Sequence, residues 1–250
     1  MVGGPSGGDK GSIFPATQHS AIIALRSEDA AVRARSLELV SAAYWRPVYK
    51  HLRLKWRKSS EEAADLTQAF FVNAFEREFF ADYDVDKARF RTFVRLCLDR
   101  FVSKQNEAGR RLKRGGGVPV LSLDVTELEG ELARGGAPQS ADGIDAHFDQ
   151  EWARSLLAMS VEALRERMEQ RGKPSYFQVF ERYDLRTEPG KASYAEVARD
   201  LGLTVFDVTN YLSVARKEFR RVVLEKLRDI TASDQEFREE ARALLGEGAV

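Results

Sequence analysis

Apolar residues recur at helical spacing along most of the chain. This spacing predicts helices over 37–54, 60–75 and 87–102, although Pro47 interrupts the first of them. The second begins in a serine- and glutamate-rich stretch that has the composition of a helix start. The helical pattern ends at three consecutive glycines, 115–117, which are a strong stop signal. The first half of the chain is therefore predicted to form a helical bundle.

The second half resumes the same pattern after an irregular stretch. Residues 118–147 contain glycines and prolines and no sustained periodicity, which predicts a flexible linker. Helices are predicted over 152–168 and 176–183, and no strand-like alternation extends beyond a few residues. The predicted fold class is all-α, with two small helical bundles joined by a flexible linker.

Residues 193–204 predict a short helix followed by a tight turn. Gly202 supplies a permissive backbone at the turn, and Thr204 is suited to cap a second helix. Amide and hydroxyl side chains near the start of that helix suit base edges in a major groove, and its later cations suit phosphates. The pattern favours a DNA-binding helix-turn-helix at the C-terminal end, and an ordinary helical hairpin is the alternative.

The charge distribution supports partners that carry negative charge. The chain has 39 basic and 39 acidic residues, but the two signs are segregated. Basic residues dominate 89–114 and 216–228, whereas acidic residues dominate 124–151 and 229–247. Two basic blocks separated by an acidic connector predict two anion-binding surfaces. Solvated helix faces are the alternative explanation of the same pattern.

The remaining chemistry excludes several classes. The single cysteine, Cys97, excludes an internal disulfide, and three histidines in separate contexts show no metal-ligand spacing. We expect no cofactor and no metal. No stretch approaches the ~20 apolar residues of a membrane helix and no leader pattern opens the chain, so a cytoplasmic location without a membrane partner is expected. No nucleophile–base pair can be named, so an enzyme is the least supported class.

Several motifs in a fixed order carry a resemblance. The second predicted helix contains Asp65-Leu66-Thr67-Gln68 ahead of two phenylalanines, and the third opens with Phe90-Arg91-Thr92-Phe93-Val94-Arg95. The basic residues 110–114, a linker and the helix-turn-helix pattern follow. This order resembles bacterial RNA polymerase sigma factors of the sigma-70 family, most closely the compact extracytoplasmic-function (ECF) type. The resemblance covers residues 16–228.

The resemblance implies a division of the chain into five segments. These are a flexible N-terminal arm (1–15), a helical domain similar to sigma region 2 (16–114), an acidic linker (115–147), a helix-turn-helix domain similar to sigma region 4 (148–231) and an acidic C-terminal tail (232–250). The first domain is implied to bind polymerase and to open the promoter. The second is implied to read an upstream promoter element.

The implied function is promoter-specific transcription initiation. The implied partners are core RNA polymerase, double-stranded promoter DNA and the melted non-template strand, with an anti-sigma or other regulatory protein as a further partner. The polymerase contacts are Asp65, Gln68 and Phe71. The promoter-opening DNA contacts are Arg91, Phe93, Arg95, Arg100, Lys104, Arg110 and Arg111. The recognition-helix DNA contacts are Thr204, Phe206, Thr209, Asn210, Ser213, Arg216, Lys217 and Arg220.

The chain also departs from the pattern of the family. Phe93 stands where many relatives carry tryptophan, and Asp99 stands where a neutral amide is usual. Thr209 and Tyr211 occupy recognition-helix positions that are often basic. Two alternative functions stay open: a helix-turn-helix regulator that does not engage polymerase, and an interaction protein whose acidic linker and tail mask the basic surfaces in cis.

Overall fold

The structure is a computed structural model that describes residues 20–76, 79–107, 125–135, 140–186 and 192–247. The described residues form helices and connecting turns and no strand, which confirms the all-α class. Within them, no helix is both long enough and apolar enough to cross a membrane.

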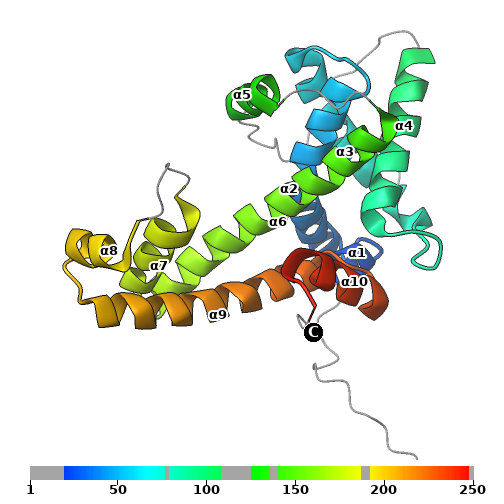
Figure 1. Cartoon of the computed structure of the whole chain (residues 1–250). Coiled ribbons are helices and arrows are strands. Elements are labelled where there is room, and N and C mark those ends of the chain that lie inside the picture. Colours follow the sequence, from blue (N-terminus) through cyan, green and yellow to red (C-terminus); the bar gives the residue numbers. More distant parts are fainter. Residues whose placement is uncertain (1–19, 77–78, 108–124, 136–139, 187–191, 248–250) are drawn as a thin grey trace, which may run out of the picture.

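Figure 1 shows the arrangement of the helices. In chain order they are α1 (Ala21–Ala24), α2 (Ala30–Leu54), α3 (Ser60–Glu76), the 3-10 turn η1 (Phe79–Asp82), α4 (Phe90–Glu107), α5 (Val125–Gly135), α6 (Ala141–Gln170), α7 (Pro174–Phe180), the π-helical turn η2 (Glu181–Leu185), α8 (Tyr194–Leu201), α9 (Val205–Asp229) and α10 (Asp234–Leu245).

Helices α2, α3 and α4 surround an aromatic core. Asp29 caps α2 by accepting hydrogen bonds from two backbone N–H groups, and α2 continues through Pro47. At the centre, the ring of Phe90 meets those of Tyr44 and Tyr83 edge-on, with centroid separations of 5.6 and 5.0 Å. Edge-to-face contacts of this kind add specific geometry to the burial of large side chains. The core therefore fixes the start of α4 against the middle of α2.

Two continuous helices connect this core to a second one. Helix α6 contributes Phe148 and Trp152 to the first core and Leu164 to the second. Helix α9 contributes Leu212 to the second core and Leu227 to the first. In Figure 1, α6 ends and α9 begins near α7 and α8. From there the two helices diverge, α6 toward α2 and α9 toward α10. The predicted flexible connection between two bundles is thus replaced, in the described residues, by two shared helices.

The predicted acidic linker is largely helical where the structure describes it. Residues 125–135 form α5, and α6 begins at Ala141 rather than after residue 147. Helix α5 is held by charge: the carboxylate of Glu129 pairs with Arg53 on α2, with an Nε–Oε1 distance of 2.7 Å. The apolar pattern missed α5 because Leu128 is its one buried side chain, and the ion pairs that join α5 to α2 leave no apolar periodicity.

The predicted acidic tail also packs as part of the fold. Residues 234–245 form α10, capped by Ser233, and its side chains Phe237 and Ala241 lie in the same core as α2 and α4. The predicted boundary at residue 232 therefore separates residues that belong to one core. Here too the charged composition obscured a helix whose buried face is narrow.

Ion pairs bury charge where α6 crosses α2. The Lys50 ammonium lies 2.8 Å from a carboxylate oxygen of Glu151, and the two side chains are 2% and 0% exposed. The carboxylate of Glu131 on α5 also binds Lys50, and Arg154 binds Glu151 at 2.7 Å. Buried charges are tolerated only when they are paired, so this cluster makes the seating of α6 on α2 specific.

We expect the substitution Lys50→Met to destabilise the protein by about 3 kcal/mol or more, because it removes the buried ammonium that contacts both Glu131 and the fully buried Glu151. Urea unfolding followed by circular dichroism measures the loss. The double variant Lys50→Met/Glu151→Gln should recover part of it, since the uncompensated buried charge is then removed as well. If the losses of stability caused by Lys50→Met and Glu151→Gln simply added in the double variant, the interaction between Lys50 and Glu151 would be contradicted.

Candidate nucleic-acid interface

Two successive N-terminal caps orient α8 and α9. Ser193 caps α8 and is bonded in return by Glu196, and Thr204 and Asp207 form the same reciprocal arrangement at α9. Between the helices, Gly202 has φ 65°, a left-handed conformation that favours glycine. The predicted tight turn is present, and it leaves the first turn of α9 exposed.

One stripe of α9 faces solvent. Phe206 is 78% exposed, more than any other large apolar side chain among the described residues. Positions three or four apart share a helix face, and the remaining predicted contacts continue this stripe. Those classed as exposed are Thr204, Thr209, Asn210, Ser213, Arg216 and Lys217, and Arg220 is partly buried.

The opposite side of α9 anchors it to its neighbours. Val208 and Ala215 are fully buried, and Tyr211 stacks on Tyr176 with ring centroids 4.1 Å apart. Tyr211 therefore faces the second core rather than a ligand. The tyrosine at this position, which is often basic in the family, therefore contributes to the packing of α9 and does not alter the exposed stripe.

One cation of the stripe is already paired. The guanidinium of Arg216 donates two hydrogen bonds of 2.8 Å to the carboxylate of Asp184 and lies over the ring of Tyr183 at 5.5 Å. Lys217 is exposed and forms no ion pair with any described residue. The two neighbouring cations thus differ in their availability to a phosphate.

Helix α4 has an open flank, defined here as Leu96, Arg100 and Lys104. These residues are four apart, so they lie on one face, and all three are exposed. The half-buried ring of Phe93 lies beside this flank and contacts Tyr83, with centroids 5.2 Å apart. Leu96 is 45% exposed although the next two residues, Cys97 and Leu98, are buried, because consecutive helix positions point in different directions.

The other basic side of α4 is the paired flank, Arg91 and Arg95. Arg91 binds the carboxylates of Asp149 and Glu240 at 3.3 and 2.8 Å, and Arg95 binds Asp145 at 3.1 Å. The guanidinium of Arg91 also lies 5.1 Å from the ring centre of Trp152 on α6. The predicted promoter-opening residues are therefore split: two are neutralised by α6 and α10, and two lie on the open flank.

Asp99 is tied to the end of α2 rather than presented to a ligand. Its carboxylate lies 3.0 Å from Nε2 of His51 and accepts hydrogen bonds from Lys55 and Trp56 at 2.7 and 2.9 Å. Burial alone raises the pKa of Asp99, but the three hydrogen-bonding partners outweigh it and lower the pKa to about 2. Its negative charge is thus compensated within the fold.

The predicted polymerase contacts on α3 divide into surface and core. Asp65 is exposed and Gln68 is partly exposed, and their spacing puts them on one face. Phe71 is 2% exposed and meets Phe70 at a centroid distance of 5.3 Å. Phe71 therefore stabilises the core and does not offer a surface contact. Arg110 and Arg111 lie outside the described residues.

No group of three or more histidine, cysteine or acidic side chains within the described ranges is arranged to hold a metal ion. Cys97 is buried, and burial raises the pKa of its thiol to about 11. Comparison of the chain with protein-family models, curated proteins and solved structures found no match. The function must therefore be inferred from the chemistry of these surfaces.

We expect Asp99→Asn to reduce stability at neutral pH by about 1–2 kcal/mol, because the hydrogen bonds to a charged carboxylate weaken. A depressed pKa contributes stability above the ordinary value near 3.8 that is lost as pH falls toward 2. The difference between the wild type and the variant should therefore shrink over that interval. Urea unfolding at several pH values tests this, with Asp86→Asn as a control that makes the same change at an exposed carboxylate without an ion pair to described residues.

Proposed function

We propose that this protein is a transcription initiation factor of the sigma type, which binds core RNA polymerase and directs it to promoters by contacting DNA. The observation that carries the proposal is the exposed stripe of α9. It combines an apolar ring, hydroxyls and an amide near the N-terminal end with cations further along. Base edges in a major groove are read by amides, hydroxyls and apolar groups, and phosphates by cations.

The open flank of α4 supports contact with an unpaired strand. Aromatic rings stack on unpaired bases and cations hold the backbone of the strand. Phe93 is half-buried beside the flank, and Arg100 and Lys104 extend it with exposed positive charge. We infer that this flank, together with the stripe of α9, gives the chain two separate nucleic-acid surfaces.

Polymerase binding is the part of the proposal that rests on α3. Asp65 and Gln68 share an accessible face of this helix, which is compatible with docking to a large partner. A helix-turn-helix regulator that does not engage polymerase would need only the stripe of α9. An interaction protein masked in cis is favoured by one specific observation, the neutralised paired flank, which is developed below.

We expect Asp65→Ala/Gln68→Ala to weaken association with core RNA polymerase at least about tenfold, since two interface side chains are lost. Pull-down with purified core polymerase measures the association, and a run-off assay on genomic fragments tests initiation. The helical content of the variant should be unchanged.

A matched control carries Glu38→Ala/Gln170→Ala, which removes one carboxylate and one amide from exposed positions on α2 and α6. It should bind polymerase like the wild type. Equal binding by both double variants would remove α3 from the docking surface. Absence of any association with core polymerase would leave the regulator as the better reading.

Within the stripe of α9 we expect two kinds of effect. Lys217→Ala should weaken binding to every duplex and lower the slope of log K against log salt concentration by about one, as loss of one phosphate contact does. Asn210→Ala should instead change which sequences are selected from a randomised duplex library, by about 1–3 kcal/mol at one base position. A uniform loss with both variants would show that Asn210 reads no base.

A further inference from the structure

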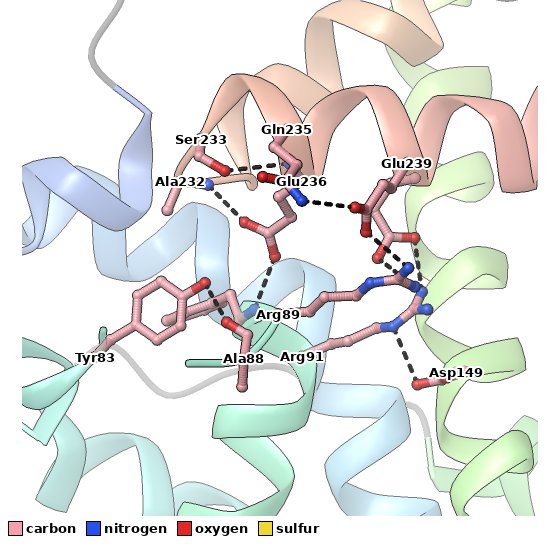
Figure 2. A network of polar contacts seen from close by, with 12 residues as sticks. Tyr83, Ala88, Arg89, Arg91, Asp149, Ala232, Ser233, Gln235, Glu236 and Glu239 are labelled. Atoms are coloured by element: carbon pink, nitrogen blue, oxygen red, sulfur yellow. Dashed lines mark hydrogen bonds and ion pairs between the residues drawn. The ribbon is translucent and has the colours of Figure 1, made fainter. Parts of the chain in front are cut away.

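The positive end of α4 is covered by a carboxylate from α10. The first N–H groups of a helix have no intrahelical partner and favour an anion. Here the carboxylate of Glu236 accepts a hydrogen bond of 2.7 Å from the backbone N–H of Phe90 and one of 2.9 Å from that of Ala232. Figure 2 shows the side chain of Glu236 with dashed contacts to Ala232 and to the segment that follows Ala88 and Arg89. Phosphate binds at helix N-termini for the same reason.

Two arginines extend this anion site. Arg89 donates to Glu239 at 2.9 Å, and Arg91 donates to Glu240 at 2.8 Å (Figure 2 draws these contacts beside Asp149). The side chain of Arg91 is 13% exposed while α10 is in place. Paired guanidinium groups next to a helix N-terminus form a constellation that suits phosphate oxygens as well as carboxylates.

One carboxylate oxygen between α10 and α4 accepts no hydrogen bond. The side chain of Glu240 is 2% exposed, and its Oε1 accepts no hydrogen bond, although Nη1 of Arg89 lies 3.5 Å away. A buried oxygen without a hydrogen bond costs free energy that an open surface would not. This oxygen therefore contributes less to holding α10 on α4 than a hydrogen-bonded carboxylate oxygen would.

The attachment of α10 is weaker than that of α6. Phe237 is the only large apolar side chain of α10 that is fully buried, with Arg228 stacked over it at 4.0 Å. Helix α6 instead buries Phe148, Trp152 and Leu156 in the same core. Because hydrophobic stabilisation follows the apolar area removed from water, α10 separates from the fold more readily than α6.

We propose that α10 is a latch whose carboxylates Glu236, Glu239 and Glu240 hold the anion site of α4 closed, and that backbone phosphates of a single DNA strand displace it. The inference rests on the proposed function, since DNA is the competitor. A tethered competitor acts at high effective concentration, and its ionic contacts weaken with salt. Displacement of α10 uncovers the backbone N–H of Phe90 and frees Arg89 and the side of Arg91 that faces Glu240, so a strand gains phosphate contacts at the start of α4.

The test compares Glu239→Gln/Glu240→Gln with the wild type in the full chain. Fluorescence anisotropy of a labelled single-stranded oligonucleotide at low salt measures affinity. If about nine molecules in ten are latched, the variant should bind about tenfold more tightly. Phe237→Ala, which removes the apolar anchor and keeps the charges, should also bind more tightly. The control Glu38→Gln/Glu247→Gln makes the same change in net charge at exposed side chains without ion pairs to described residues.

A second measurement follows the latch itself. Addition of the oligonucleotide to the wild type should raise hydrogen–deuterium exchange in α10 amides, because local opening controls that exchange. Equal affinities of wild type and both α10 variants would overturn the latch and leave the proposed function standing. Equal gains in the α10 and control variants would overturn it as a general charge effect. Absence of binding by every variant would overturn the latch together with the proposed function.

Discussion

The shared membership of α6 in both hydrophobic cores is the constraint on which the rest of the structure depends. Its residues between Phe148 and Leu156 complete the core around α2 and α4, and Leu164 and Met168 complete the core beneath α7 and α9. A helix of 30 residues is a stiff connection. While α6 is packed on α2, the stripe of α9 and the open flank of α4 are therefore held in one relative position. Helix α9 adds a second connection, since it contributes Leu212 to one core and Leu227 to the other.

Ion pairs determine how these helices pack against one another. Lys50 and Glu151 are buried between α2 and α6, and the acidic residues of α5 and α10 lie on cations of α2 and α4. A buried ion pair stabilises the folded state little more than apolar packing would, but a buried charge that loses its partner costs several kcal/mol. The ion pairs therefore specify which helices pack together.

This pairing separates the cations of the chain by availability. Arg100, Lys104 and Lys217 are exposed, whereas Arg91 and Arg95 are neutralised within the fold. In the proposed function the exposed cations are available to nucleic acid at once. Arg91 loses its contact with Glu240 only when α10 moves, and Arg95 stays paired with Asp145 of α6. The proposed function and the proposed latch then draw on the same kind of contact, because carboxylates and phosphates bind a guanidinium in the same way.

The sequence by itself determined the helical class, the presence of α2 to α4, the bounds of α3 to within one residue, and the turn at Gly202 and Thr204, because periodicity, caps and left-handed turns depend on residues close together in the chain. It also determined the exposed stripe of α9. Only the tertiary structure decided that α5 and α10 are helices packed on the fold, and that Phe71 is buried. Those outcomes depend on contacts such as Arg91 with Glu240, 149 positions apart, and no local pattern records which distant carboxylate will neutralise which cation.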